Sequence, residues 1–307
     1  GYFDEVQSFL ARRSDWPGEP YLRSQSEAGV VASGQAAVAS FFAERRPQTP
    51  VGALALAAHY ESVGQTREAH TLVIDAWRRM AMSAEDQAAY LSRHGAILAP
   101  HHLARTDAML WQGDLSDAAR MRDLLPAGQR ALLAARTALL RGARGVDAKI
   151  AAVPARLQDD PGLHHARFVW RAGKGRFQDA KDLLRDRSTS LERLGRPEAF
   201  ASRRRALARD EMRDGNPAHA YALAANHYLT EGSNYADLEW LAGYIALRKL
   251  QDPGRALAHF KNHSAASSSP ISRGRAGYWI GMAHLAMGNA AAADQAFADG
   301  AQYQTSF

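Results

Sequence analysis

The chain has 307 residues, no cysteine and a formal net charge of +6. Without cysteine it can form neither a disulfide nor a cysteine-based zinc site. The positive charge is carried mostly by arginine and amounts to about one excess charge per 50 residues. No zinc-finger spacing or RNA-binding aromatic signature accompanies it, so we expect no nucleic-acid partner. The longest apolar runs, such as residues 51–58, fall far short of the ~20 residues of a membrane-spanning helix, so we also expect no membrane span.

Composition predicts an all-α fold. Ala, Leu, Arg, Glu and Gln, which all favour helices, outweigh the β-branched Val and Ile. Helices of about 11 to 12 residues with short connections would give roughly 18 helices. The Pro- and Gly-containing segments 15–20, 46–52 and 159–162 are predicted to be turns, and no segment has the length of a domain linker. We therefore expect a single domain over residues 1–307.

Along the chain, a small residue recurs five positions before an alanine, each time between two amphipathic stretches. A glycine at the first position can close one helix in the left-handed conformation, and the alanine lets the paired helix approach closely. The pairs are Gly64/Ala69, Gly113/Ala118, the looser Ala143/Ala148, Gly175/Ala180, Gly215/Ala220, Gln251/Ala256 and Gly288/Ala293. Their spacing of roughly 30 to 50 residues is typical of helix-pair repeats.

The last third of the chain shows this pattern most clearly. Asn216-Pro217, Asp252-Pro253 and Ser269-Pro270 each combine a capping side chain with a proline at the first helical position. Two units approach the tetratricopeptide pattern of packing positions, with Trp240, Ala256 and Phe260 in one and Gly281, Ala293 and Phe297 in the other. We predict that these aromatic rings lie in the core. The pattern predicts a right-handed superhelical array, an α-solenoid of tetratricopeptide-like helix pairs, curved into a ring or a horseshoe.

Several local patterns resemble chemical sites, and each has a simpler interpretation. His259 and His263 are four residues apart, so they could share one helix face as metal ligands, but no third ligand is evident and surface or capping roles are favoured. The adjacent pairs 101–102 and 164–165 would point about 100° apart on a helix and chelate poorly. We therefore expect no metal and no cofactor.

The sequence contains no catalytic constellation. Glu61-Ser62 lies at the end of a predicted first helix, just before Gly64, where a solvated glutamate is ordinary. The glycine-containing runs 142–145 and 173–175 lack the Lys-Ser/Thr ending of a phosphate-binding loop. No Gly-x-Ser-x-Gly nucleophile elbow occurs.

Basic clusters are the remaining candidates for ligand contact. The runs 12–13, 45–46, 78–79 and 203–205 consist of consecutive arginines, which a helix spreads over different faces. A solvated, ion-paired face is the favoured interpretation, and contact with an anionic ligand or another domain is the alternative. For the second role the candidates are Arg78, Arg79, His102, Arg105, Arg203 and Arg204.

Residues 235–248, which read YADLEWLAGYIALR, resemble a signature of soluble lytic murein transglycosylases, in the superhelical region before their lysozyme-like domain. Residues 269–273, 278–281 and 305–307 are similar to the stretch that leads into that family's linker. Upstream the similarity rests on residues 15–18, on Arg105, Asp107 and Trp111 after His102, on residues 153–154 with 160–163, and on residues 220–224.

The resemblance implies a bacterial periplasmic protein that acts on peptidoglycan. In that family one glutamate of a Glu-Ser motif acts as acid and then base, leaving a 1,6-anhydro product. This chain has no Arg-Gln-Glu-Ser-like, Gly-Leu-Met-Gln or Asn-Ala-Gly stretch, and Glu61-Ser62 lies in the wrong region. We therefore expect a fragment without catalytic residues, in which residues 233–307 lead toward a linker and a catalytic domain absent from this chain. No signal peptide is visible.

Three functions remain open from the sequence. The first is a scaffold that holds glycan strands or positions the catalytic domain of its parent enzyme. The second is a protein-interaction solenoid that recruits a partner in cell-wall synthesis or division. The third is an active transglycosylase whose catalytic part lies outside this sequence.

Overall fold

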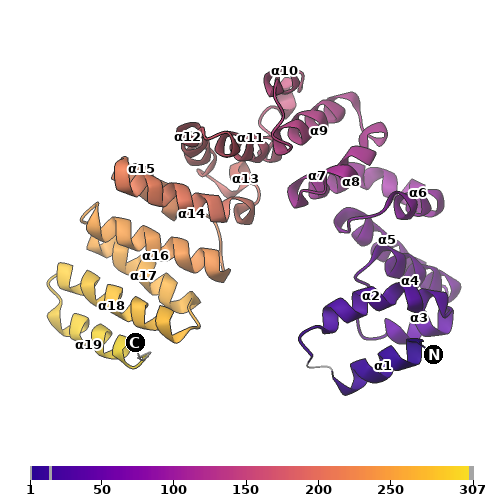
Figure 1. Ribbon diagram of the computed structural model, residues 1–307, viewed down its shortest axis with the longest axis horizontal. Coiled ribbons are helices and arrows are strands. Elements are labelled where there is room, and N and C mark those ends of the chain that lie inside the picture. Colours follow the sequence, from indigo (N-terminus) through magenta and orange to yellow (C-terminus); the bar gives the residue numbers. More distant parts are fainter. Residues whose placement is uncertain (1, 14–15, 304–307) are drawn as a thin grey trace. The chain divides into compact units, whose positions relative to one another are not determined.

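The computed structural model describes residues 2–13 and 16–303, and the described residues form an all-α structure with no strand (Figure 1). They contain nineteen α-helices, close to the number predicted, and three short 3-10 helices. The predicted turn at 15–20 is described only from Trp16, and the family-like residues 305–307 lie outside the described residues. No helix in the described part is both long and apolar enough to cross a bilayer.

The chain divides into two compact units, each with its own core. The first comprises residues 1–138 and 145–157, and the second comprises residues 139–144 and 158–307. The single domain predicted over residues 1–307 stays a prediction.

The first unit contains the helices from α1 to α10, except for the end of α9. They are α1 (Tyr2–Arg12), α2 (Glu19–Ala32), α3 (Gln35–Phe41), α4 (Pro50–Ser62), α5 (Thr66–Arg79), α6 (Ala84–Leu98), α7 (His102–Gln112), α8 (Leu115–Arg120), α9 (Ala127–Leu140) and α10 (Val146–Ala151). The 3-10 helices η1 (Ala99–His101), η2 (Arg122–Leu124) and η3 (Ala155–Leu157) connect them. Its core is built around Trp77 and Tyr90, whose rings stack 6.2 Å apart and are fully buried.

The second unit contains α11 to α19, of which the last six lie side by side in chain order (Figure 1). They are α11 (Pro161–Gly173), α12 (Phe177–Arg187), α13 (Leu191–Leu194), α14 (Pro197–Asp214), α15 (Pro217–Ala225), α16 (Gly232–Arg248), α17 (Pro253–Ala266), α18 (Pro270–Ala286) and α19 (Ala290–Ala301). Phe260 is fully buried between α16 and α18, whereas Trp240 and Phe297 are half-buried. The prediction that these rings lie in the core is confirmed for Phe260, while Trp240 packs against the same core from a half-buried position.

The predicted caps begin their helices as expected. The side chain of Asn216 accepts hydrogen bonds from the amides of Ala218 and His219, at 2.8 and 3.2 Å. Asp252 accepts from the amide of Arg255 at 2.9 Å, and Ser269 from the amide of Ser272 at 3.2 Å. A proline follows each cap at the start of the helix, where its missing N–H leaves no helical bond unmade.

The alanines predicted from the repeat are buried, with one exception. Six of the seven are fully buried: Ala69, Ala118, Ala180, Ala220, Ala256 and Ala293. Ala148 is exposed, so the looser match Ala143/Ala148 is wrong; the short helix α10 buries Val146 instead. These small side chains allow neighbouring helices to pack closely.

The closing glycines follow the prediction with one exception. Gly64, Gly113, Gly175 and Gly288 have φ angles of 80°, 86°, 73° and 79°, in the left-handed region. Gly215 has a φ of −114°, so the left-handed prediction is wrong there. A Cβ at Gly215 would lie 2.5 Å from the carboxyl carbon of Glu211, so glycine makes room for a buried side chain at this position.

Candidate functional site

Arg78, Arg79 and Arg203 are exposed, as a ligand-contacting role requires. Arg79 pairs with Asp75 one turn earlier on α5, with 3.0 Å between the guanidinium and the carboxylate. Arg203 lies on α14, in the second unit, so the six predicted residues are divided between the two compact units.

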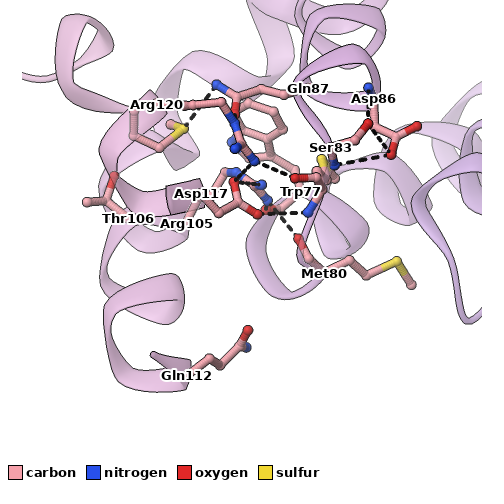
Figure 2. A network of polar contacts seen from close by, with 12 residues as sticks. Trp77, Met80, Ser83, Asp86, Gln87, Arg105, Thr106, Gln112, Asp117 and Arg120 are labelled. Carbon is pink, nitrogen blue, oxygen red and sulfur yellow. Dashed lines mark hydrogen bonds and ion pairs between the residues drawn. The ribbon is translucent and has the colours of Figure 1, made fainter. Parts of the chain in front are cut away.

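Arg105, which the sequence analysis placed among possible ligand contacts, is instead a fully buried structural residue. Its Nη1 donates to the carbonyl oxygens of Trp77 and Met80, at 2.6 and 2.9 Å, and its guanidinium lies 4.6 Å from the centre of the Trp77 ring. These carbonyls belong to the end of α5, where unpaired backbone acceptors attract a cation. Arg105 therefore caps the C-terminus of α5 from α7 (Figure 2).

Asp117 on α8 completes this network. Its Oδ1 lies 2.6 Å from Arg105 Nη2, and its Oδ2 accepts a hydrogen bond from the amide of Met82 at 2.7 Å. Arg120 reaches the same carboxylate at 3.1 Å and also binds Gln87 on α6 (Figure 2). Burial lowers the pKa of Arg105, and the Asp117 carboxylate opposes that shift. The network ties α5, the start of α6, α7 and α8 together.

His102 lies at the edge of this network and is half-buried. Its ring centre is 5.6 Å from that of Trp77, at an interplanar angle of 54°. Burial lowers its pKa, and the neighbouring charges of His101 and Arg105 lower it further. His102 is therefore neutral near pH 7 and packs on the core of the first unit.

Arg204 is fully buried, so it too is not available for ligand contact. It donates to the carbonyl oxygen of Leu223 at 2.9 Å and to the hydroxyl of Ser188 at 2.6 Å. Both acceptors lie at helix C-termini, those of α15 and α12, where the helix dipoles favour a cation. Burial lowers the pKa of Arg204 to about 9. Its neighbour Arg203 points to solvent, as the prediction that consecutive arginines diverge requires.

The second unit holds a buried network that the sequence analysis missed. Glu239, on α16, is 5% exposed and accepts hydrogen bonds from His227 at 2.9 Å, His259 at 2.8 Å and Asn262 at 2.9 Å. Burial alone would raise the pKa of Glu239, but the three hydrogen bonds lower it to about 2. The carboxylate is therefore ionised, and its hydrogen bonds join α16 to α17 and to the connection before α16.

His259 and His263 belong to the packing of α16 against α17, so the predicted surface or capping role is wrong. His259 Nε2 lies 2.9 Å from the Tyr221 hydroxyl, while His263 is buried and its Nδ1 donates to the carbonyl oxygen of Ala236 at 2.8 Å. Within the described part of the chain, no group of three His, Cys, Asp or Glu side chains could hold a metal ion. The four-residue spacing of His259 and His263 places both side chains on the face of α17 that contacts α16.

Glu61 is exposed on the last turn of α4, where the sequence analysis placed it. His94 Nδ1 lies 3.9 Å from its carboxylate, and burial lowers the pKa of this histidine. Comparison with protein-family models, curated proteins and solved structures finds no match for this chain.

Proposed function

We propose that the chain is the non-catalytic helical scaffold of a periplasmic lytic transglycosylase acting on peptidoglycan, where it holds glycan strands or positions the catalytic domain. One observation carries the proposal. The buried charged side chains of Arg105, Arg204 and Glu239 form hydrogen bonds that join neighbouring helices. Buried charged side chains that join helices support a scaffold role for the chain.

The family-like segment 235–248 supports this interpretation. It coincides with α16, whose Glu239 and Ala236 receive hydrogen bonds from α17 and whose Gly243 contacts Phe260. A signature made of helix-pairing residues is what a scaffold region would carry. We also propose that the helices form a right-handed superhelical array of tetratricopeptide-like helix pairs, curved into a ring or a horseshoe.

Sedimentation with insoluble peptidoglycan tests the glycan-holding role. The chain should sediment with purified sacculi at low salt, and less so at high salt, because a positively charged protein meets the free carboxylates of the wall. Failure to sediment at low salt would remove this role and leave only the positioning of a catalytic domain.

The protein-interaction solenoid is the second candidate, and a feature of α18 favours it. Ile271, Tyr278 and Leu285 are 58%, 51% and 47% exposed, and their spacing of seven residues places them on one face of the helix. An amphipathic helix of a partner would cover such a stripe. Capture of one stoichiometric partner from periplasmic extract, lost in Tyr278→Lys, together with no affinity for sacculi, would favour this candidate over the scaffold.

A further inference from the structure

Two glycine-containing basic runs that are distant in sequence adjoin one another in the second unit. Residues 141–144 read Arg-Gly-Ala-Arg, and residues 171–176 read Arg-Ala-Gly-Lys-Gly-Arg. Trp170 Nε1 donates to the carbonyl oxygen of Ala143 at 3.0 Å, and a Cβ added to Gly142 would lie 4.0 Å from Lys174 Nζ. We call these two runs, together with Arg167 on α11, the basic turn pair.

Six cationic side chains gather in the basic turn pair, and the carboxylates of Asp179 and Asp182 offset only part of their charge. Among the described residues, no carboxylate lies within ion-pair distance of Arg141, Arg144, Arg167 or Lys174. Of the other two, Arg176 pairs with Asp179 at 2.6 Å, and Arg171 donates to the backbone oxygen of Asp179. Arg141, Arg144 and Lys174 are exposed.

The neighbouring helix α12 shows what an ordinary solvated face of this protein contains. There Asp182 pairs with Arg185 at 3.0 Å, and Asp186 with Arg193 at 3.2 Å. Like charges held together without such partners repel one another and destabilise the folded state. In the basic turn pair, burial and the charges of Arg167 and Arg176 lower the pKa of Arg171, whereas Asp179 and Asp182 raise it. An external anion would relieve this repulsion.

An exposed aromatic residue adjoins the same surface. Phe177 directly follows Arg176 and is 52% exposed, although it begins the amphipathic helix α12. Clusters of Lys and Arg attract the negative surface of anionic phospholipids, and an exposed aromatic ring can enter the headgroup boundary beside them. Free phosphate or a soluble polyanion would make no use of the ring.

We propose that the basic turn pair docks on the surface of an anionic phospholipid bilayer, with Phe177 as its apolar contact. The arginine guanidiniums and the Lys174 ammonium bind lipid phosphates, which suit both groups. Because Gly173 and Gly175 have no atom within 4 Å of an added Cβ, headgroups can approach the backbone of the second turn. This docking is peripheral, and it does not rest on the proposed role in peptidoglycan binding.

Vesicle sedimentation of the full chain tests the proposal. The wild type should bind vesicles containing phosphatidylglycerol at low salt and should not bind vesicles of phosphatidylcholine alone. A variant with Arg141→Gln, Arg144→Gln, Arg167→Gln and Lys174→Gln should lose roughly 100-fold or more in affinity.

The matched control removes the same number of positive charges from exposed positions elsewhere in the chain. It carries Arg122→Gln, Arg213→Gln, Lys249→Gln and Lys261→Gln, and it should bind within about threefold of the wild type. Thermal unfolding of both variants checks that they fold.

Phe177→Ser separates a bilayer from other phosphate sources. It should weaken vesicle binding severalfold and leave binding of inorganic tripolyphosphate unchanged. The proposal is overturned if the wild type ignores anionic vesicles, or if the two four-site variants lose affinity equally. It is also overturned if Phe177→Ser binds vesicles like the wild type, or if the four-site loss is seen with sacculi and not with vesicles.

Discussion

Arg105 and Asp117 form a buried ion pair, with 2.6 Å between Nη2 and Oδ1 and side chains that are 0% and 3% exposed. Breaking such a pair from one side leaves an uncompensated buried charge, which costs about 3 to 5 kcal/mol. Asp117→Asn should therefore lower the free energy of unfolding by about that amount, measured by urea titration followed by circular dichroism.

Asp123 supplies the matched control for this substitution. Its carboxylate is 89% exposed and lies 3.7 Å from Arg122, so Asp123→Asn should change the free energy of unfolding by less than about 0.5 kcal/mol. Equal effects of the two substitutions would contradict the assignment of Asp117 to a buried network.

Arg203 and Arg204 are neighbours in sequence with opposite environments. Arg204→Leu removes the donors to Leu223 and Ser188 and leaves two buried acceptors unsatisfied, so it should destabilise the fold by about 2 to 4 kcal/mol. Arg203→Leu should be within about 0.5 kcal/mol of the wild type, because that side chain is exposed. Thermal unfolding midpoints compare the two. A larger loss for Arg203→Leu would show that the assigned phase of α14 is wrong.

Glu239 should make the stability of the chain dependent on acid. Its hydrogen bonds lower the folded-state pKa from 4.5 to about 2, so it stabilises the fold fully above pH 4.5 and less as the pH falls toward 2. The integrated effect is about 3 kcal/mol. Glu239→Gln should be less stable than the wild type at pH 6, and the difference should shrink as the pH is lowered toward 2.5.

Urea titrations at several pH values measure this dependence. Glu231→Gln, at an exposed position just before the same helix, should follow the wild-type curve. If the Glu239→Gln curve runs parallel to the wild type across this range, the carboxylate is not held ionised by His227, His259 and Asn262.

Two helical glycines should respond in opposite directions to alanine. At Gly243 an added Cβ would lie 2.6 Å from the fully buried Phe260 ring, so Gly243→Ala should lower the stability of the fold by about 1 to 3 kcal/mol. At Gly173 nothing lies within 4 Å, so Gly173→Ala should stabilise α11 by up to about 1 kcal/mol. Calorimetric midpoints measure both. The same sign for both changes would contradict the assigned packing of α16 against α17.

The helices and their close contacts were predictable from local patterns. Cap and proline pairs such as Asn216-Pro217 act within one turn, and the small side chain of Ala256 is required wherever a neighbouring helix approaches. The predicted burial of Ala148 was wrong because α10 has only six residues and buries Val146, which lies on the other side of the helix. The predicted left-handed conformation of Gly215 was wrong because glycine is required there by the nearby buried Glu211 side chain and not by the backbone.

The polar networks were not predictable in the same way. Adjacent arginines do not reveal which of them faces the core, so Arg203 and Arg204 look alike in sequence. The partners of Glu239 lie 12, 20 and 23 residues away, and they meet only when α17 and the connection before α16 both pack against α16. One signal was available: Glu239 and His259 each adjoin a predicted packing residue, Trp240 and Phe260, so they had to lie near the same helix interface.

Incubation of purified sacculi with the chain tests the scaffold account most directly, with bound protein and soluble products measured in the same sample. We expect salt-sensitive binding of the chain to the sacculi and no release of 1,6-anhydromuropeptides. Release of these products by the 307-residue chain would contradict it, because the product requires an acid-base residue that the scaffold account denies.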